Sequence, residues 1–275
     1  MKKILVPTDF SNQAYNATKA AAIIARKMNA EIILLHILDL PQQGSDSINK
    51  GTPATEVMFF KKAADAKLEE LAHDPIFNGI TISSSLILDR TSLGVTKSAE
   101  NNKVNLIVMG SHGVSGVKEY FVGSNTEKVV RTSNIPVLVI KGEVEDFEIK
   151  DFVFASDFSE GMTEPFKKAL NFNKILGSKF HLLMVNTPNN FKPTHVAEEI
   201  VEKFLDTLTD KEFDLCTYND MNIEKGIINF SKKIDADLIG IATHGRTGLA
   251  HFFNGSISED LVNHSSKSVI TFKID

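Results

Sequence analysis

The chain has 275 residues, of which 42% are hydrophobic and 24% charged, with a formal net charge of −5 and a single cysteine, Cys216. This composition is that of a folded globular protein and excludes a disordered chain. One cysteine excludes an intramolecular disulfide and a cysteine-based zinc site, and the lack of a basic stripe argues against a nucleic-acid partner.

No stretch comes near the roughly 18 apolar residues that a membrane-spanning helix needs. The first residues, MKKILVPTDF, also lack the apolar core of a signal peptide. We therefore expect a cytoplasmic protein without a membrane partner.

Short apolar runs alternate with amphipathic stretches along the whole chain. Near-continuous runs rich in Ile, Val and Leu are typical of strands buried on both faces of a parallel sheet. One helix is predicted to begin after Ser11, which is a candidate N-cap, and another to begin at Lys225. Two more helices are predicted around 165–176 and 196–208. The predicted fold is therefore α/β, with two tandem three-layer α/β/α sandwiches, each around a five-stranded parallel sheet. The predicted strands contain residues 4–6, 32–35, 86–88, 106–109 and 137–140 in the first half, and 152–154, 182–185, 213–218, 238–242 and 269–272 in the second.

Two signatures occur twice. ILVPTDFS at 4–11 returns as FVFASDFS at 152–159, and GSHG at 110–113 returns as ATHG at 242–245. A Gly-Ser pair follows each glycine loop, at 123–124 and at 255–256, so that both late signatures repeat after 132 residues. We predict two domains, 1–143 and 150–275, joined by a short charged linker. The first copy is 16 residues longer between its signatures, and we place the insertion at 40–57.

Both signatures fall where an open parallel sheet binds ligands, beyond the carboxyl ends of its strands. Asp9 and Asp157 follow the first strand of each half, and the glycine loops follow the fourth. Glycine at 110 and 113 lets the backbone approach phosphate oxygens closely, and a helix that opens at Gly123 and Ser124 directs N–H groups at an anion.

Each of these features also has a purely structural interpretation. Residues 124–127 and 256–259 read as capping boxes, which stabilise a helix start without a ligand. Asp9 followed by Ser11 is a common helix-entry device, and a histidine at 112 or 244 can simply satisfy a tight turn. The other histidines, His36 among them, are expected to be structural or exposed.

The spacing Gly110, two residues, Gly113, nine residues, Gly123, Ser124 resembles the motif G-2x-G-9x-G-(S/T) of the ATP-binding members of the universal stress protein family. These members also have an aspartate after the first strand. The likeness covers essentially the whole chain as two copies. It implies a Rossmann-like fold with strand order 3-2-1-4-5, and a pseudo-dimer in which the two domains pair through their last strands. A homodimer of whole chains stays open.

The resemblance also implies which residues bind the nucleotide. Ala242 stands where the second copy should have its first glycine, and its methyl group would intrude toward the phosphates or strain the turn, so the second site is the weaker one. Ile37 and Val185, at the ends of the second strands, would pack against adenine, although both also fit a strand core. The implied first site is Asp9, Ile37, Met109, Gly110, His112, Gly113, Gly123, Ser124 and Asn125, and the implied second site is Asp157, Val185, His244, Gly245, Gly255 and Ser256.

We therefore expect a stress-response sensor or regulator that binds ATP or a related adenine nucleotide, with Mg²⁺ as counter-ion. No residue is an evident general base, so any ATPase activity should be slow. Two alternatives remain: a structural or chaperone-like stress protein without a nucleotide, and a true hydrolase or phosphotransferase. No P-loop, G-x-G-x-x-G, nucleophile-elbow or H-E-x-x-H motif occurs.

Overall fold

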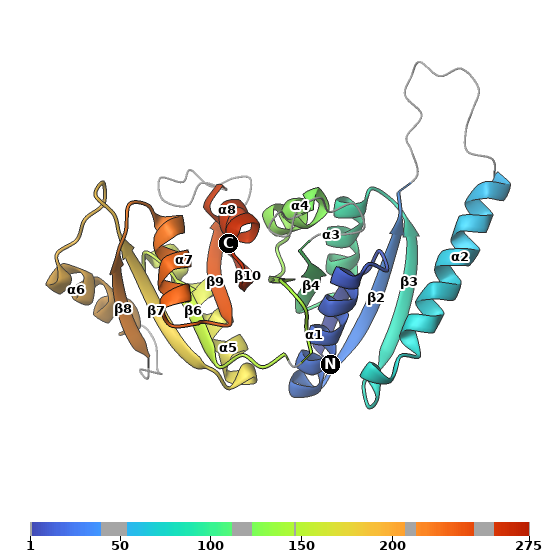
Figure 1. Cartoon of the computed structure of the whole chain (residues 1–275), viewed down its shortest axis with the longest axis horizontal. Helices are drawn as coiled ribbons and strands as arrows, with labels where there is room; N and C mark the ends of the chain where they lie inside the picture. Colours follow the sequence, from blue (N-terminus) through green and yellow to red (C-terminus); the bar gives the residue numbers. More distant parts are fainter. Residues whose placement is uncertain are drawn as a thin grey trace, which may run out of the picture.

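The computed structural model of this chain describes residues 2–39, 54–111, 123–145, 147–206, 213–244 and 256–274. Strands and helices alternate along both halves, as the apolar runs predict (Figure 1). The elements of the first half are β1 (Lys2–Pro7), α1 (Asn12–Met28), β2 (Ala30–Leu38), α2 (Ala54–Ala72), a short 3₁₀ helix η1 (Pro75–Phe77), β3 (Ile82–Leu88), α3 (Thr91–Asn101), β4 (Leu106–Gly110), α4 (Ser124–Thr132) and β5 (Val137–Ile140). Those of the second half are β6 (Asp151–Ala155), the 3₁₀ helix η2 (Glu160–Met162), α5 (Thr163–Leu176), β7 (Lys179–Asn186), α6 (Thr194–Leu205), β8 (Asp214–Asn219), α7 (Ile223–Lys233), β9 (Leu238–His244), α8 (Ser256–His264) and β10 (Ser268–Ile274).

The strands form one ten-stranded sheet in the order β3-β2-β1-β4-β5-β10-β9-β6-β7-β8. Each half has the predicted order 3-2-1-4-5 with parallel pairing. The last strands of the halves, β5 and β10, pair antiparallel, with Leu138 opposite Ile270 and Val139 opposite Val269. The predicted fold is thus confirmed, and the two copies pair with each other inside one chain.

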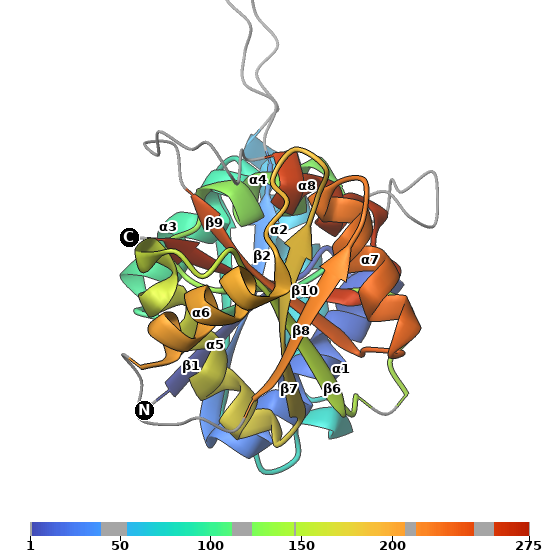
Figure 2. The ribbon, with the colours of Figure 1, turned by 90° about the vertical axis from the view of Figure 1, so that its left-hand side faces the viewer.

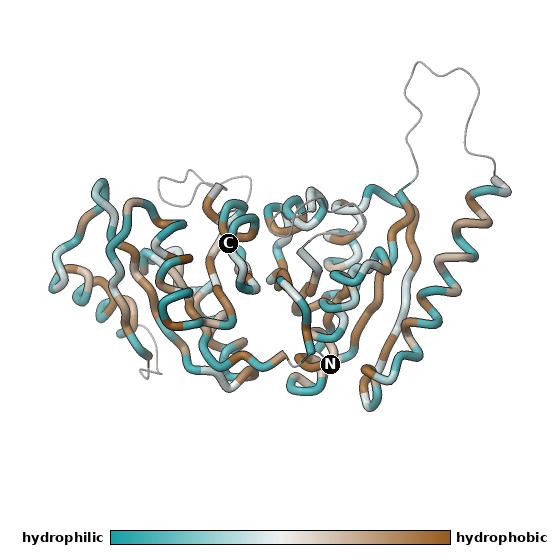
Figure 3. The backbone as a smooth tube through the Cα atoms, viewed as in Figure 1, coloured by the Kyte–Doolittle hydropathy of each residue, from teal (hydrophilic) through white to brown (hydrophobic). Residues whose placement is uncertain are grey.

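Helices cover both faces of the sheet, because alternate strand residues point to opposite sides. Ile4 and Val6 belong to the core beneath α1, α2, α5 and α6, whereas Leu5 belongs to the core beneath α3, α4, α7 and α8. Figure 2 shows the twist of the sheet between these layers, and Figure 3 shows hydrophobic residues concentrated along the strands. None of the helices in the described ranges is both long and apolar enough to cross a membrane.

Local sequence explains where the first helix begins and ends. Ser11 is its N-cap, as predicted, and its Oγ accepts a hydrogen bond of 3.2 Å from the Ala14 amide. Asn29 ends the helix in the left-handed conformation, which asparagine tolerates better than most residues. The predicted insertion at 40–57 is partly wrong, because residues 54–57 form the first turn of α2; residues 40–53 lie outside the described part of the chain.

A buried lysine lies beside the antiparallel seam. Lys141 follows β5 directly, and its backbone N–H donates to Ser268 Oγ at 3.2 Å. Its Nζ is buried without a hydrogen-bond partner, and burial lowers the pKa of Lys141 to about 8. Lys273, 132 residues later in the matching place after the core of β10, also has a pKa lowered by burial. The seam therefore holds a charge that folding disfavours.

We predict that Lys141→Met stabilises the protein at pH 7, because the buried ammonium is removed and its stem is kept. A rise in Tm of about 2–4 °C corresponds to about 1 kcal/mol in a chain of this size. The cost of burying the charged Lys141 acts fully below pH 8 and disappears between pH 8 and the unfolded pKa of about 10.5. The Tm difference between Lys141→Met and the native protein should therefore shrink as pH rises. Thermal unfolding from pH 7 to 10 measures this. Lys273→Met is the matched control with a smaller expected gain; an unchanged or lower Tm for Lys141→Met would contradict the account.

Candidate functional site

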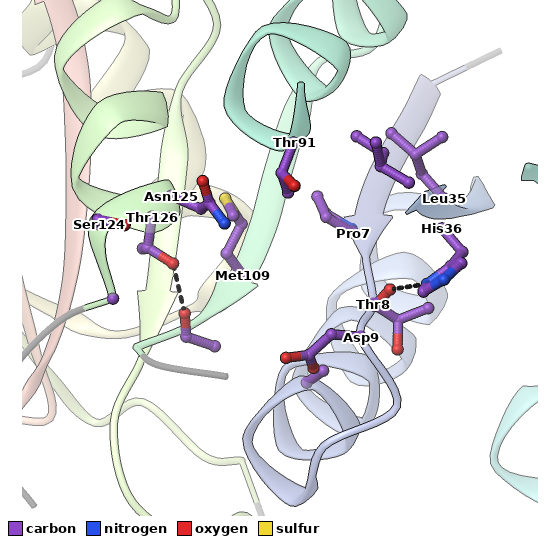
Figure 4. Close-up of a pocket in the computed structure, with 14 residues that line it drawn as sticks. Pro7, Thr8, Asp9, Leu35, His36, Thr91, Met109, Ser124, Asn125 and Thr126 are labelled. Atoms are coloured by element: carbon purple, nitrogen blue, oxygen red, sulfur yellow. Dashed lines mark hydrogen bonds between the residues drawn. The ribbon is translucent and has the colours of Figure 1, made fainter. Parts of the chain in front are cut away.

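A cavity of about 210 Å³ lies at the carboxyl ends of β1, β2 and β4. These strands are neighbours, and the connection after β1 leads to one face of the sheet while that after β4 leads to the other. This is the position at which open α/β sheets bind ligands. Figure 4 shows Asp9 on one side of the cavity and Ser124, Asn125 and Thr126 on the other.

The turn after β1 explains the repeated Asp-Phe-Ser signature. Phe10 has a positive φ of 64°, a conformation that costs a bulky residue about 1–3 kcal/mol and persists only where its surroundings hold it. Thr8 Oγ1 accepts from the Phe10 amide at 3.0 Å, and Asp9 Oδ1 accepts from the Ser11 amide at 3.1 Å. Asp9 therefore supports the entry to α1, as its structural interpretation expects, and it also lines the cavity.

The same turn recurs in the second half with the same hydrogen bonds. Phe158 has a φ of 56°, and its amide donates to Ser156 Oγ at 2.9 Å. Asp157 Oδ1 accepts from the Ser159 amide at 3.0 Å and from its hydroxyl at 2.9 Å. A hydroxyl residue thus precedes the aspartate in both copies because it fixes the strained phenylalanine. This role of Thr8 and Ser156 was visible in the repeat, although the sequence analysis did not use it.

Gly110 lets β4 approach the first turn of α1. A Cβ at this position would lie 2.7 Å from the carbonyl oxygen of Gln13, closer than real Cβ contacts allow. The Gly110 carbonyl also accepts a hydrogen bond of 3.0 Å from Thr126 Oγ1 (Figure 4). A side chain at position 110 would collide with α1. The sequence analysis had explained this glycine by the close approach of phosphate, whereas in the structure the neighbour that requires it is α1.

In the second half, where an alanine stands at the matching position, the first helix begins differently. Ala242 replaces the glycine, and the residue matching Gln13 is Gly161. The first turn there is the 3₁₀ helix η2, and the α-helix begins only at Thr163. A Cβ on Gly161 would meet no atom closer than 3.8 Å. The extra methyl therefore coincides with a different helix start in this half.

The α4 N-terminus faces the cavity without a side-chain cap. Gly123 is the N-cap, in an extended conformation, and Ser124 is the first helical residue. The predicted capping box at 124–127 is therefore wrong, because Ser124 sits one position too late for its hydroxyl to cap. The first amides of a helix lack intrahelical acceptors and lie at its positive end, so this terminus suits an anion.

The opposite wall is apolar and is positioned by a glycine that the sequence analysis missed. Gly94, in the first turn of α3, lies against Ile37, and a Cβ there would be 2.8 Å from Ile37 Cδ1. The second half repeats the contact between Gly226 and Val185. Because Gly94 and Gly226 are also 132 residues apart, the spacing of the repeat could have found them.

His36 also lines the cavity, contrary to the expectation that it is merely structural or exposed. Its Nδ1 donates to the Thr8 carbonyl at 2.7 Å. Its ring lies 4.6 Å from that of Phe10. The second copy has Met184 in the matching place, so the internal repeat could not have pointed to His36 as a cavity residue.

Seven of the nine residues expected in the first site line this cavity. His112 and Gly113 lie outside the described residues. No group of three or more His, Cys, Asp or Glu able to hold a metal ion occurs in the described ranges. The seven are Asp9, Ile37, Met109, Gly110, Gly123, Ser124 and Asn125, and the wall also includes Pro7, Thr8, Ala14, Leu35, His36, Thr91 and Thr126.

The matching position in the second half is nearly closed. The cavity beside Asp157 and Val185 measures about 20 Å³. A short loop after β7 crosses it, because Asn186 Nδ2 donates to the Lys192 carbonyl at 2.9 Å and Asn186 Oδ1 accepts from the Lys192 amide at 3.2 Å. Gly245 and Gly255 lie outside the described residues, as do the side chains of His244 and Ser256.

We predict that Gly110→Ala destabilises the protein by about 1–3 kcal/mol, because the first turn of α1 must move to admit the methyl group. Urea unfolding without nucleotide measures this loss. Ala242→Gly is the matched control, and its smaller expected cost of about 0.5–1 kcal/mol reflects a freer backbone. If Gly110→Ala unfolds at the same urea concentration as the native protein, the close approach to Gln13 is not a constraint.

Comparison with known proteins places the chain among relatives of the same architecture. The universal stress protein family model matches residues 1–141 and 148–273. Universal stress protein MJ0577 of Methanocaldococcus jannaschii is 33% identical over 153 residues, which are 51% of this chain and 94% of that protein. Universal stress protein Slr1230 of Synechocystis is 22% identical over 99% of this chain and all of its own length.

A solved universal stress protein from Archaeoglobus fulgidus superimposes with a TM-score of 0.76 at 22% identity, covering 99% of this chain and 98% of its own. This likeness concerns the fold, which extends over both halves. Since the family matches cover nearly the whole chain in two consecutive regions, the chain belongs to the universal stress protein family and consists of two tandem copies.

Proposed function

We propose that this chain binds an adenine nucleotide, ATP or a close relative, in its N-terminal half and acts as a stress-response sensor or regulator. The observation that carries the proposal is the cavity itself: it joins an apolar wall, a carboxylate and an uncapped helix N-terminus at the switch point of the sheet. Residues 1–143 and 150–275 would be its two domains.

The residues present fit the parts of a nucleotide in order. The partly buried Ile37 offers apolar surface for the base, with Met109 beside it in the cavity wall, and Asp9 lines the same cavity. A carboxylate accepts hydrogen bonds from ribose hydroxyl groups, and such charge-assisted bonds are stronger than neutral ones. Adenine and ribose would therefore lie over β1 and β2.

The phosphates would then reach the start of α4. The backbone N–H groups of Ser124 and Asn125 lie in the first helical turn, where no intrahelical acceptor is available to them. Gly123 before them carries no side chain that could occupy the anion position. The N-terminal dipole adds a favourable interaction of about 0.3–1 kcal/mol for negative charge.

Mg²⁺ would bind together with the nucleotide and not at a separate site formed by protein ligands alone. It usually keeps several waters and binds through phosphate oxygens with one or two carboxylates. This agrees with the lack of a metal-binding cluster in the described ranges. Bound Mg²⁺ would neutralise charge on the phosphates.

Hydrolysis is proposed to be slow at most, since the proposed site includes no evident general base to activate a water. Binding of the nucleotide would act through a conformational signal or a protein contact.

We also propose that the protein is cytoplasmic and that two whole chains can pair as a homodimer.

One observation favours the chaperone-like alternative. The first turns of α2 expose Met58, Phe59 and Phe60, with 59%, 68% and 48% of their surfaces accessible. Contiguous exposed apolar side chains often mark a surface for protein contacts. Suppression of the aggregation of a model substrate that is independent of nucleotide would support this alternative.

We predict that Asp9→Asn weakens binding of adenosine and ATP about tenfold or more, because it removes the charge on the proposed ribose acceptor. Asparagine keeps an Oδ1 that can accept from the Ser11 amide, so the turn and the stability should persist. Isothermal titration calorimetry on the purified chain measures the affinity, and thermal unfolding verifies the fold.

Asp157→Asn is the matched control, because it alters the same turn in the nearly closed half and should leave nucleotide affinity unchanged. Equal affinities for the native chain and Asp9→Asn would reject the role of this carboxylate. A loss shared equally by both variants would place the nucleotide elsewhere.

A further inference from the structure

A second cavity, of about 370 Å³, lies away from the nucleotide site at the opposite ends of the strands. It is bounded by the amino ends of β1, β4 and β5, by α5 and by the last part of β10. Its floor is apolar and includes Phe172 and Phe272, while its rim has Lys2, Lys168 and Asn171. We call it the α5 groove.

The internal repeat provides a counterpart for this groove. Residues early in the first half match residues 148 positions later, as Lys3 matches Asp151, and residues from β4 onward match residues 132 positions later. Asn105, before β4, therefore matches Asp237, before β9. Asn105 Oδ1 accepts from the Lys3 amide at 2.9 Å, and Asp237 Oδ2 accepts from the Asp151 amide at 3.0 Å. The two amino-terminal edges are thus built alike, and the counterpart groove runs beside α1.

The counterpart groove is filled by the chain itself. The linker after β5 passes between the halves, beside α1, on its way to β6 (Figure 1). Val144 and Ile149 are each only 5% exposed within the core that includes α1, and Phe147 packs against the same core. The Val144 amide donates to Asn16 Oδ1 at 3.2 Å, which ties the linker to α1.

This segment shows which peptide chemistry fits such a groove. Its apolar residues stand at positions 144, 147 and 149, and Glu143, Glu145 and Glu148 stand between or beside them. At its end, the Lys150 amide donates to Asp237 Oδ2 at 2.7 Å. The segment therefore buries Val144 and Ile149, while the glutamates beside them are exposed.

We propose that the α5 groove binds an extended acidic and apolar segment of a partner protein, in the manner in which the linker fills the counterpart groove. Apolar residues spaced like Val144, Phe147 and Ile149 would enter the floor beside Phe172 and Phe272. Carboxylates between them would face the positive rim of Lys2 and Lys168. The groove is continuous with the seam between the halves, since β10 contributes both to it and to the pairing with β5.

The probe is a fluorescein-labelled peptide with the linker sequence GEVEDFEIK, residues 142–150. Fluorescence anisotropy with the full-length chain should show saturable binding in the micromolar to millimolar range. A peptide with alanine in place of its phenylalanine should bind at least fivefold more weakly, because the largest apolar anchor is lost. Absence of saturable binding at millimolar protein would overturn the proposal.

Two variants locate the peptide. Asn171→Trp should reduce binding at least fivefold by filling the groove from the exposed face of α5, and Lys168→Glu should do so by repelling the carboxylates. Lys167→Glu makes the same charge change on the same helix at a residue that does not line the groove, so it is the matched control and should bind normally. Binding that ignores both groove variants would mean that the peptide displaces the native linker instead, which would also overturn the proposal. Thermal unfolding of each variant verifies that it is folded, and because this control needs no nucleotide, the two proposals stay independent.

Discussion

The parallel pairing of β1 with β4 is the contact on which the candidate site depends. Ile4 lies opposite Leu106 and Leu5 opposite Ile107, so two strands far apart in sequence end side by side. Their connections then diverge to opposite faces and leave a gap that the sheet cannot close. Gly110 keeps the gap narrow on the α1 side by omitting a Cβ that would strike Gln13. The polar turn at Asp9 and the α4 N-terminus consequently face each other.

The two halves share this frame and differ in what covers it. Both hold a phenylalanine at positive φ by the same pair of side-chain hydrogen bonds, and both use a glycine in the helix after the third strand to seat the residue ending the second. In the second half, Asn186 pins a short loop across the strand ends and the cavity falls from about 210 to about 20 Å³. At the carboxyl ends of the strands, one half thus has an open cavity and the other a nearly closed one.

The architecture could be predicted from the sequence because buried parallel strands appear as short apolar runs and the internal repeat appears as recurring motifs. Apolar runs located each strand, and the Asp-Phe-Ser and Gly-Ser signatures predicted a site at the carboxyl ends of β1 and β4, where the structure has a cavity. Local details were less accessible. Ser124 followed by Glu127 fits a capping box, yet the helix begins one residue earlier than that motif requires. The contact between Gly110 and α1, and the entry of His36 into the cavity, depend on tertiary packing that no local pattern reports.

The most direct test of the account is the stoichiometry of ATP binding to the native chain, measured by calorimetric titration in the presence of Mg²⁺. The account predicts one nucleotide per chain, bound in the N-terminal half, because the described cavity at the carboxyl ends of the strands measures about 210 Å³ in that half and about 20 Å³ in the other. A titration without heat for ATP, ADP, AMP and adenosine, or one that fits two equal sites per chain, would contradict it.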